Sequence, residues 1–163
     1  MLRTLKSLCA TLAISFASAA YADEVLLTVS GDVGLKGNKN TWTFDRKALE
    51  ALPSKSIDTT TIWTEGTQSF EGVSLDVLLD HVQAEQGIIR AVALNDYAVT
   101  IPTSDATDGG PIVAYLRDGK AMSVRDKGPL WIIYPYDANE AYQSEEIYAR
   151  SIWQLNRLEV VAQ

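Results

Sequence analysis

Cysteine and histidine are almost absent from this chain. Its 163 residues include one cysteine, Cys9, and one histidine, His81. A hydrolytic triad of the usual kind needs a base beside an oriented nucleophile, and a zinc site needs several nitrogen or sulfur ligands. The sequence therefore offers neither site. His81 lies beside Leu78 and Leu79 in a helical pattern, and we expect it at the surface, on the flank of that helix.

Long apolar runs are also scarce. The N-terminal run, Leu8 to Phe16, follows two basic residues and precedes Ala20-Tyr21-Ala22. This order is typical of a signal peptide that is cleaved after a small-x-small sequence. We therefore predict a signal peptide over 1–22 and a mature chain that begins at Asp23 in the periplasm. The run is shorter than the roughly 20 apolar residues that span a bilayer, so we expect no membrane insertion.

This cleavage would also remove the cysteine. Cys9 lies within the predicted signal peptide, so the exported chain would contain neither a thiol nor a disulfide. Cleavage before Cys9, as in a lipoprotein, is the alternative. Only eight residues precede Cys9, however, and no apolar core comes before it.

Positive charge is in short supply as well. The 14 Lys and Arg residues are outnumbered by 21 Asp and Glu residues, which gives a formal net charge of −7. An acidic chain is a poor partner for a nucleic-acid backbone or an anionic membrane surface. We interpret the excess of acidic residues as a solubility feature. About 140 residues follow the signal peptide, enough for one domain with a sizeable core, which we place at 23–163.

The hydrophobic pattern predicts an α+β domain with a mixed or antiparallel sheet and few helices. Asp45 is positioned to cap a short helix that ends at Pro53, and Ser74 opens a second helix with Gly87 near its end. Glycines between 31 and 37, with Asn38, predict a mobile turn. Alternating or β-branched segments predict seven strands: Val25–Ser30, Ile57–Thr64, Arg90–Leu94, Val99–Ile101, Ile112–Leu116, Leu130–Tyr134 and Leu155–Val161.

Three aspartates near glycines form the most plausible carboxylate group. Asp105, Asp108 and Asp118 could in principle serve a metal ion, but they lack the alternating ligand pattern of a calcium loop. We interpret them mainly as turn formers.

Aromatic residues fall on several different elements, mostly at the ends of predicted strands. There they could sandwich a flat heterocycle and direct an indole N–H or a phenol O–H toward its edge. The alternative is that they fill the core of a small sheet protein. The residues concerned are Trp63, Tyr97, Trp131, Tyr134 and Trp153.

Two neighbouring blocks match a known pattern. The first is Trp63-Thr64-Glu65-Gly66, and the second is Phe70-Glu71-Gly72-Val73-Ser74-Leu75-Asp76-Val77-Leu78-Leu79. Together they resemble the C-V-E-G and F-x-G-V-x-L-x-x-L-L stretches of the sulfite-oxidase-like, molybdopterin-binding domain family. Further blocks follow in the family's order: Tyr97–Asp105, Ala114–Lys120, Asp126–Pro135 and Arg150–Val160. The resemblance extends from Asp23 to Val161 and implies that family's single-domain fold.

The main departure from the family falls on the metal ligand. In these enzymes two dithiolene sulfurs of the pterin cofactor and one cysteine thiolate hold molybdenum, and Trp63 occupies the cysteine position. An indole cannot replace a soft anionic ligand. The resemblance therefore implies a retained pterin cleft in which neither molybdenum nor enzymatic activity is expected.

The resemblance also implies which residues would hold a pterin. Glu65 or Asp105 would accept its N–H groups, and aromatic rings would cover its faces. Lys127 and Gly128 lie in the loop that lines the cofactor in the family. Arg150 would meet the polar tail, although it could instead pair with Glu145, Glu146 or another acid. The full set is Trp63, Thr64, Glu65, Tyr97, Asp105, Lys127, Gly128, Trp131, Tyr134 and Arg150.

Short exported chains without the cysteine are similar to periplasmic pterin-binding regulators. These act on the sensory domain of a membrane-bound diguanylate cyclase/phosphodiesterase. The resemblance thus implies a reduced, metal-free, tetrahydropterin-like ligand and an effect on cyclic-di-GMP and biofilm formation. The segments Gly31–Asn40 and Ala138–Tyr148 are candidate moving parts. Two alternatives remain: an oxidoreductase subunit that keeps molybdopterin without the thiolate, and a structural protein with an empty cleft.

Overall fold

The computed structural model describes residues 24–34 and 40–163. The predicted signal peptide lies outside these residues, as do Gly37 and Asn38 of the predicted turn. Among the described helices, none is both long and apolar enough to cross a bilayer.

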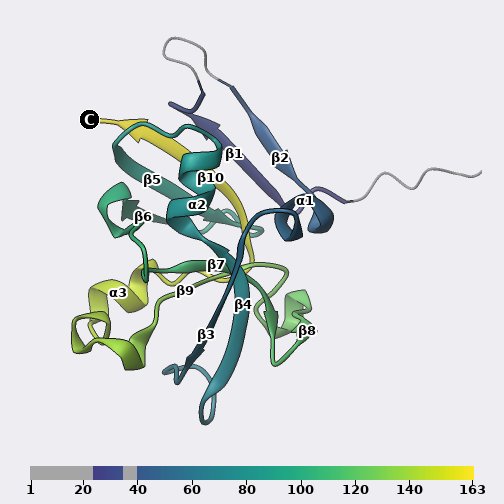
Figure 1. Cartoon of the computed structure of the whole chain (residues 1–163), viewed down its shortest axis with the longest axis vertical. Coiled ribbons are helices and arrows are strands. Elements are labelled where there is room, and N and C mark those ends of the chain that lie inside the picture. Colours follow the sequence, from purple (N-terminus) through teal and green to yellow (C-terminus); the bar gives the residue numbers. More distant parts are fainter. Residues whose placement is uncertain (1–23, 35–39) are drawn as a thin grey trace, which may run out of the picture.

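One of the two sheets is mixed. Its strands follow the order β2-β1-β10-β5-β6 (Figure 1). β1 pairs with β10 in parallel, and all other neighbours are antiparallel. The strands are β1 (Leu27–Gly31), β2 (Trp42–Phe44), β5 (Gly87–Ala93), β6 (Ala98–Pro102) and β10 (Leu155–Ala162).

The second sheet is antiparallel and runs β3-β4-β7-β8, with β9 also paired to β7. In Figure 1 the ribbon formed by β3 and β4 extends away from the mixed sheet, and α3 lies on the same side as its tip. The strands are β3 (Ser54–Thr59), β4 (Gln68–Ser74), β7 (Ile112–Arg117), β8 (Lys120–Ala121) and β9 (Trp131–Ile133).

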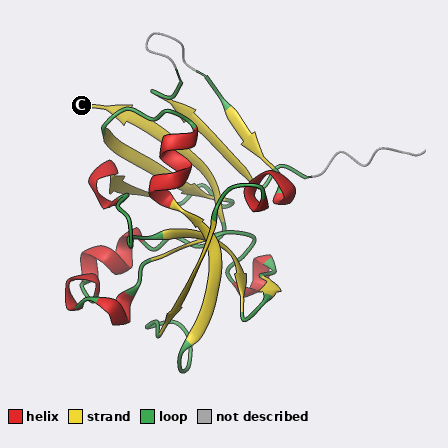
Figure 2. Ribbon diagram, in the orientation of Figure 1, coloured by secondary structure: helices red, strands yellow, loops and turns green. Residues whose placement is uncertain are grey.

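The helices are short. α2 lies across the mixed sheet in Figure 2, and its terminal His81 is exposed and contacts the rings of Trp42 and Phe44 on β2. Asp45 caps α1, because its carboxylate accepts the Ala48 N–H at 2.7 Å. The helices are α1 (Arg46–Glu50), α2 (Leu75–His81) and α3 (Glu145–Arg150), with 3₁₀ turns η1 (Thr103–Asp105), η2 (Val124–Asp126), η3 (Tyr136–Ala138) and η4 (Glu140–Tyr142).

One hydrophobic core joins both sheets. All three residues of β9 are fully buried, as are Leu75 and Leu78 of α2. The glycine of the Phe70-Glu71-Gly72-Val73 block has a packing reason. A Cβ at Gly72 would lie 2.1 Å from the Val113 carbonyl oxygen on β7. The close approach of β4 to β7 therefore requires glycine.

The α+β class with few helices is confirmed, and most predicted strands are present. The predicted strand Ile57–Thr64 is wrong at its C-terminal end, because β3 ends at Thr59 and Trp63 lies in a turn. The second helix ends at His81, and Gly87 instead begins β5. Three strands (β2, β4 and β8) and α3 were not predicted.

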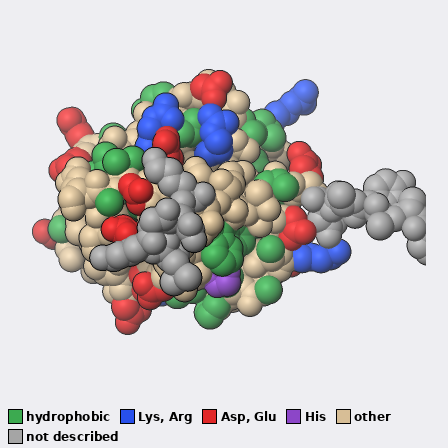
Figure 3. Space-filling view, turned by 90° about the horizontal axis from the view of Figure 1, so that it is seen from above, with side chains coloured by type: hydrophobic (Ala, Val, Ile, Leu, Met, Phe, Trp, Pro, Cys, Tyr) green, Lys and Arg blue, Asp and Glu red, His purple; other side chains and the backbone are tan. Residues whose placement is uncertain are grey.

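The charged surface agrees with the acidic composition. Figure 3 shows acidic and basic side chains distributed over one face, with no continuous basic surface among the described residues on that face.

Candidate functional site

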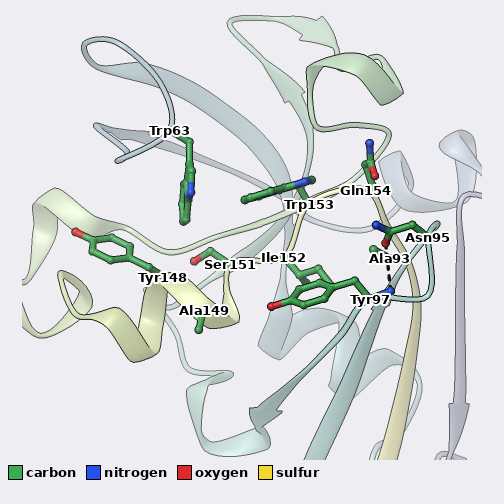
Figure 4. A pocket seen from close by; sticks show the side chains of 10 residues that line it. All are labelled: Trp63, Ala93, Asn95, Tyr97, Tyr148, Ala149, Ser151, Ile152, Trp153 and Gln154. Carbon is green, nitrogen blue, oxygen red and sulfur yellow. Dashed lines mark hydrogen bonds between the residues drawn. The ribbon is translucent and has the colours of Figure 1, made fainter.

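A cleft of about 380 Å³ opens where two turns meet the C-terminal end of α3 and the segment that follows it. Trp63 comes from the turn after β3, and Asn95 and Tyr97 come from the turn between β5 and β6 (Figure 4). The rest of the wall is formed by the end of α3 and by the residues that come directly after it. Four of the lining side chains are aromatic, which gives the cleft a mainly apolar surface. The lining residues are Trp63, Ala93, Asn95, Tyr97, Tyr148, Ala149, Ser151, Ile152, Trp153 and Gln154.

Trp63 contacts four other rings. Its ring centroid lies 5.7 Å from that of Tyr148 and 5.7 Å from that of Trp153, both in edge-on geometry. Behind it are Trp131 at 5.8 Å and Tyr136 at 6.3 Å. Aromatic pairs at such distances prefer tilted or edge-on contacts, so these rings hold the Trp63 indole in a defined orientation.

Hydrogen bonds fix the turn that carries Trp63. The Asp137 carboxylate accepts the Thr60 backbone N–H at 2.6 Å and the Thr60 hydroxyl at 2.7 Å. The Thr61 hydroxyl then accepts the Trp63 N–H at 3.1 Å and lies 2.8 Å from the hydroxyl of Thr64. The two hydrogen bonds from Thr60 lower the pKa of Asp137 below its ordinary value, because they favour the charged carboxylate. Through its contact with Thr61, the Thr64 hydroxyl braces the turn.

Trp153 forms the wall next to Trp63 and is 37% exposed. The Lys127 ammonium lies 4.3 Å from its ring centroid, a cation–π contact. A backbone bridge links Trp153 to Trp131. Lys127 thus supports the cleft from outside and is not one of its lining residues.

Asn95 and Gln154 are the amide side chains of the cleft. The Asn95 carboxamide oxygen accepts the Tyr97 backbone N–H at 3.2 Å. The Gln154 amide nitrogen donates to the Val124 carbonyl at 2.8 Å. The Leu94 N–H donates to the Gln154 carbonyl at 2.9 Å, which brings the two amides to the same end of the cleft (Figure 4).

Asp105 is not among the residues that line this cleft, and its carboxylate is engaged within the protein. Arg150 donates to both of its oxygens, at 3.2 and 2.9 Å, and the Tyr134 hydroxyl donates to it at 2.7 Å. Burial and this hydrogen bond raise the pKa of Tyr134. Arg150 also pairs with Glu146, so the alternative of an acidic partner for Arg150 is the one observed. Asp105 is therefore a partner in a side-chain network as well as part of a turn.

Trp131 lies behind the cleft wall, and Gly128 is not among the lining residues. Trp131 is fully buried, and its indole N–H donates to the Ser151 carbonyl at 3.1 Å. A Cβ at Gly128 would lie 1.9 Å from the Met122 carbonyl oxygen, so the close approach permitted by this glycine is to the protein's own backbone. The Tyr136 hydroxyl donates to the Ser151 hydroxyl at 2.7 Å, and burial raises the pKa of Tyr136 to about 12. These residues form the rigid support of the cleft.

The structure thus brings two of the ten predicted residues, Trp63 and Tyr97, to the cleft. Thr64 and Lys127 support it from adjacent positions, and Glu65 is exposed in the Trp63 turn. The sequence analysis missed Tyr148, Asn95 and Gln154 as lining residues. Asn95-Asp96 carries an ordinary turn signal, but no pattern in the sequence indicates that this turn faces α3.

The donor set around Trp63 does not suit molybdenum. Its neighbours are aromatic rings, and within the described ranges no three His, Cys, Asp or Glu residues group as metal ligands. Molybdenum in the resembled enzymes needs one cysteine thiolate, and no thiolate lies beside Trp63 among the described residues. The flat, apolar walls suit the pterin part of molybdopterin instead.

No family model matches the chain, and no curated protein matches it either. Solved structures do match. One is the sulfane dehydrogenase SoxCD from Paracoccus pantotrophus, with a TM-score of 0.60 and 17% sequence identity. The match covers 84% of this chain and 38% of the SoxCD chain, so this protein spans well under half the length of that relative. The chain has the sulfite-oxidase-like fold of SoxCD, and the expected architecture is confirmed.

Proposed function

We propose that this protein is a periplasmic, non-catalytic binding protein for a metal-free pterin. The observation that carries the proposal is the cleft itself, in which Trp63, Tyr148, Trp153 and Tyr97 present aromatic surfaces where the resembled enzymes would place a metal ligand. Aromatic surfaces favour flat heterocycles through stacking. The volume of about 380 Å³ lies within the range of small-molecule sites.

The lining residues favour binding over catalysis. None of the ten is His, Cys, Asp, Glu or Lys, and the titratable ones are Tyr97 and Tyr148. General acid–base catalysis near neutral pH depends on a group whose pKa lies close to 7. Ligand recognition needs only shape, stacking surfaces and a few polar contacts.

The signalling part of the proposal comes from the resemblance to pterin-binding regulators. The partner would be the periplasmic sensory domain of a membrane diguanylate cyclase/phosphodiesterase. A ligand changes signalling only if the bound form presents a different or stiffer surface. Exposed apolar side chains adjoin the cleft residues in sequence, namely Ile62 at 61% exposure and Leu94 at 46%. An occupied cleft would therefore affect residues that a partner can contact.

Ligand release tests the proposal. The protein is purified from its native periplasm and denatured, and the supernatant is analysed by mass spectrometry and for metals. We expect a stoichiometric, metal-free pterin. Stoichiometric molybdenum would overturn the proposal in favour of an oxidoreductase subunit, and the absence of any small molecule would favour a structural protein.

A pair of tryptophan variants locates the site. We expect Trp63→Ala to lose the ligand, because stacking on one aromatic ring contributes about 1–3 kcal/mol, or roughly 5- to 150-fold in affinity. Trp42→Ala is the matched control, since Trp42 is also partly buried but lies on β2 of the mixed sheet, against His81 of α2. Glu65→Ala should retain the ligand, because Glu65 is exposed. If Trp63→Ala retains the ligand, the binding site lies outside this cleft.

A further inference from the structure

We infer that Asn95 and Gln154 recognise the lactam edge of the ligand, the ring N–H beside a ring carbonyl. The inference rests on the proposed pterin function and specifies which edge of the heterocycle faces the protein. It replaces the expected carboxylate clamp with a pair of neutral amides. The argument depends on which amide atoms are already occupied within the protein.

The orientation of the Asn95 amide follows from its own turn. A backbone N–H can only donate, so the atom that receives the Tyr97 N–H at 3.2 Å must be the carboxamide oxygen. The Asn95 NH₂ group therefore points away from the turn. It has no protein partner among the described residues, and it supplies a hydrogen-bond donor to the cleft.

The orientation of the Gln154 amide is fixed in the opposite sense. A backbone carbonyl can only accept, so the atom 2.8 Å from the Val124 oxygen must be the amide nitrogen. The Gln154 side-chain oxygen is left as an acceptor, and within the described part of the chain nothing donates to it. Two main-chain bonds hold this residue in place: its N–H donates to the Lys127 carbonyl at 3.0 Å, and its carbonyl accepts the Leu94 N–H.

One end of the cleft thus presents an unused donor on Asn95 and an unused acceptor on Gln154. Figure 4 shows the Asn95 and Gln154 side chains at the same end, beyond the Trp153 indole. The complementary ligand edge has an acceptor beside a donor in the ring plane. A pterin carries this edge as N3–H and C4=O, and its reduced forms keep it. The ring N–H would donate to Gln154, and the carbonyl would accept from Asn95.

A pair of neutral amides discriminates against ligands whose donors and acceptors do not match its own. A ligand with the same shape but a reversed edge would place a donor against the Asn95 NH₂ and an acceptor against the Gln154 oxygen. Groups left unpaired in this way weaken binding more than the loss of a surface contact does. 2,4-Diaminopteridine has this reversed edge, whereas lumazine keeps N3–H and C4=O and differs at C2 and N1, where an oxo group and an N–H replace the amino group and the ring acceptor.

The ligand series tests the inference without altering the protein. Affinities of the ligand-free protein for pterin, lumazine and 2,4-diaminopteridine are measured near neutral pH by calorimetry. We expect pterin and lumazine to bind within a few-fold of each other and 2,4-diaminopteridine to bind about 10- to 100-fold more weakly. Equal affinity for pterin and 2,4-diaminopteridine would overturn the inference and leave the proposed function intact. Failure of all three to bind would overturn the proposed function itself.

A matched pair of variants assigns the effect to Asn95. Asn95→Asp keeps the oxygen that accepts the Tyr97 N–H but replaces the donor with an acceptor. We expect pterin to bind about 10-fold more weakly and the preference over 2,4-diaminopteridine to narrow. Asn139→Asp is the control, because the Asn139 oxygen likewise accepts an N–H two residues on, from Ala141 at 2.9 Å, outside the cleft lining. Equal effects of the two variants would remove Asn95 from ligand recognition.

Discussion

Asp105 shows how a single residue can fit a motif and yet serve another role. The family block ends on this aspartate, and a pterin edge would suit its carboxylate. In the structure Arg150 donates to both of its oxygens and Tyr134 to one of them, and its side chain is only 16% exposed. The network anchors the C-terminal end of α3 close to the point where Tyr148 and Ala149 enter the cleft wall. Asp105 therefore positions the cleft wall from outside.

Removing this carboxylate should cost considerable stability. Asp105→Ala leaves the Tyr134 hydroxyl without its acceptor and Arg150 with Glu146 alone. We expect the free energy of unfolding to fall by about 2–3 kcal/mol, because breaking a largely buried pair leaves its partners unsatisfied. Urea denaturation measures this change.

The control for Asp105 is another aspartate in an ion pair. Asp108 pairs with Lys55 at 3.5 Å, but its side chain is fully exposed. Asp108→Ala should therefore leave the free energy of unfolding almost unchanged. Similar losses for the two variants would show that burial of the Asp105 network contributes nothing.

At the scale of elements, the turn after β3 is held to η3 by one carboxylate. Asp137 accepts two hydrogen bonds from Thr60, and these lower its pKa from the ordinary value of 3.8. A carboxyl group whose pKa is lower in the folded state stabilises the fold above pH 3.8, and the contribution disappears as the pH falls through the folded pKa. The position of Trp63 should therefore become less fixed in acid.

An NMR titration of the Asp137 carboxyl group tests this link. We expect its pKa to lie below 3.8 in the wild-type protein and to rise in Thr60→Val, which loses the hydroxyl donor but keeps the N–H. Thr100→Val, at an exposed position of β6, should leave the titration unchanged. A wild-type pKa at or above 3.8 would contradict the proposed anchoring of the turn.

Elements with a strong local pattern could be predicted from the sequence, whereas those defined by tertiary pairing could not. The alternation in Val25–Ser30 and Leu155–Val161 identified β1 and β10. β2 has three residues and pairs only with β1, so its own sequence carries too short a pattern.

The candidate site was only partly predictable for a related reason. Family blocks located Trp63 and Tyr97, but the cleft is assembled from turns. Asp96 and Gln154 have positive φ angles of 63° and 53°, which ordinary turn or strand patterns do not reveal. The orientation of Asn95 and Gln154 depends on these turns and on hydrogen bonds to distant backbone groups, which single-sequence patterns do not encode.

At the scale of the whole molecule, a bound pterin should stabilise the entire fold. A ligand that binds only the folded state at 100 times its Kd adds about 2.7 kcal/mol to the free energy of unfolding. For a domain of this size we expect the Tm to rise by roughly 8–10 °C. Differential scanning calorimetry with and without pterin measures the shift.

The two tryptophan variants make this thermal shift specific. Trp63→Ala should show little increase in Tm at the same pterin concentration, whereas Trp42→Ala should show the full increase even if its own Tm is lower. A full increase in Trp63→Ala would place pterin binding elsewhere on the protein.

The parallel pairing of β1 with β10 has a consequence for the order of folding, and so for the proposed export. β10 occupies the middle of the mixed sheet, and its partner β1 lies more than a hundred residues earlier in the chain. A polypeptide threaded through a translocon from its N-terminus would deliver β1 first and β10 last. The mixed sheet therefore cannot close until nearly the whole chain has emerged, and such long-range pairing is intrinsically slow. In the proposed export of this protein, the order of strands would thus delay closure of the sheet until nearly the whole chain has passed the channel.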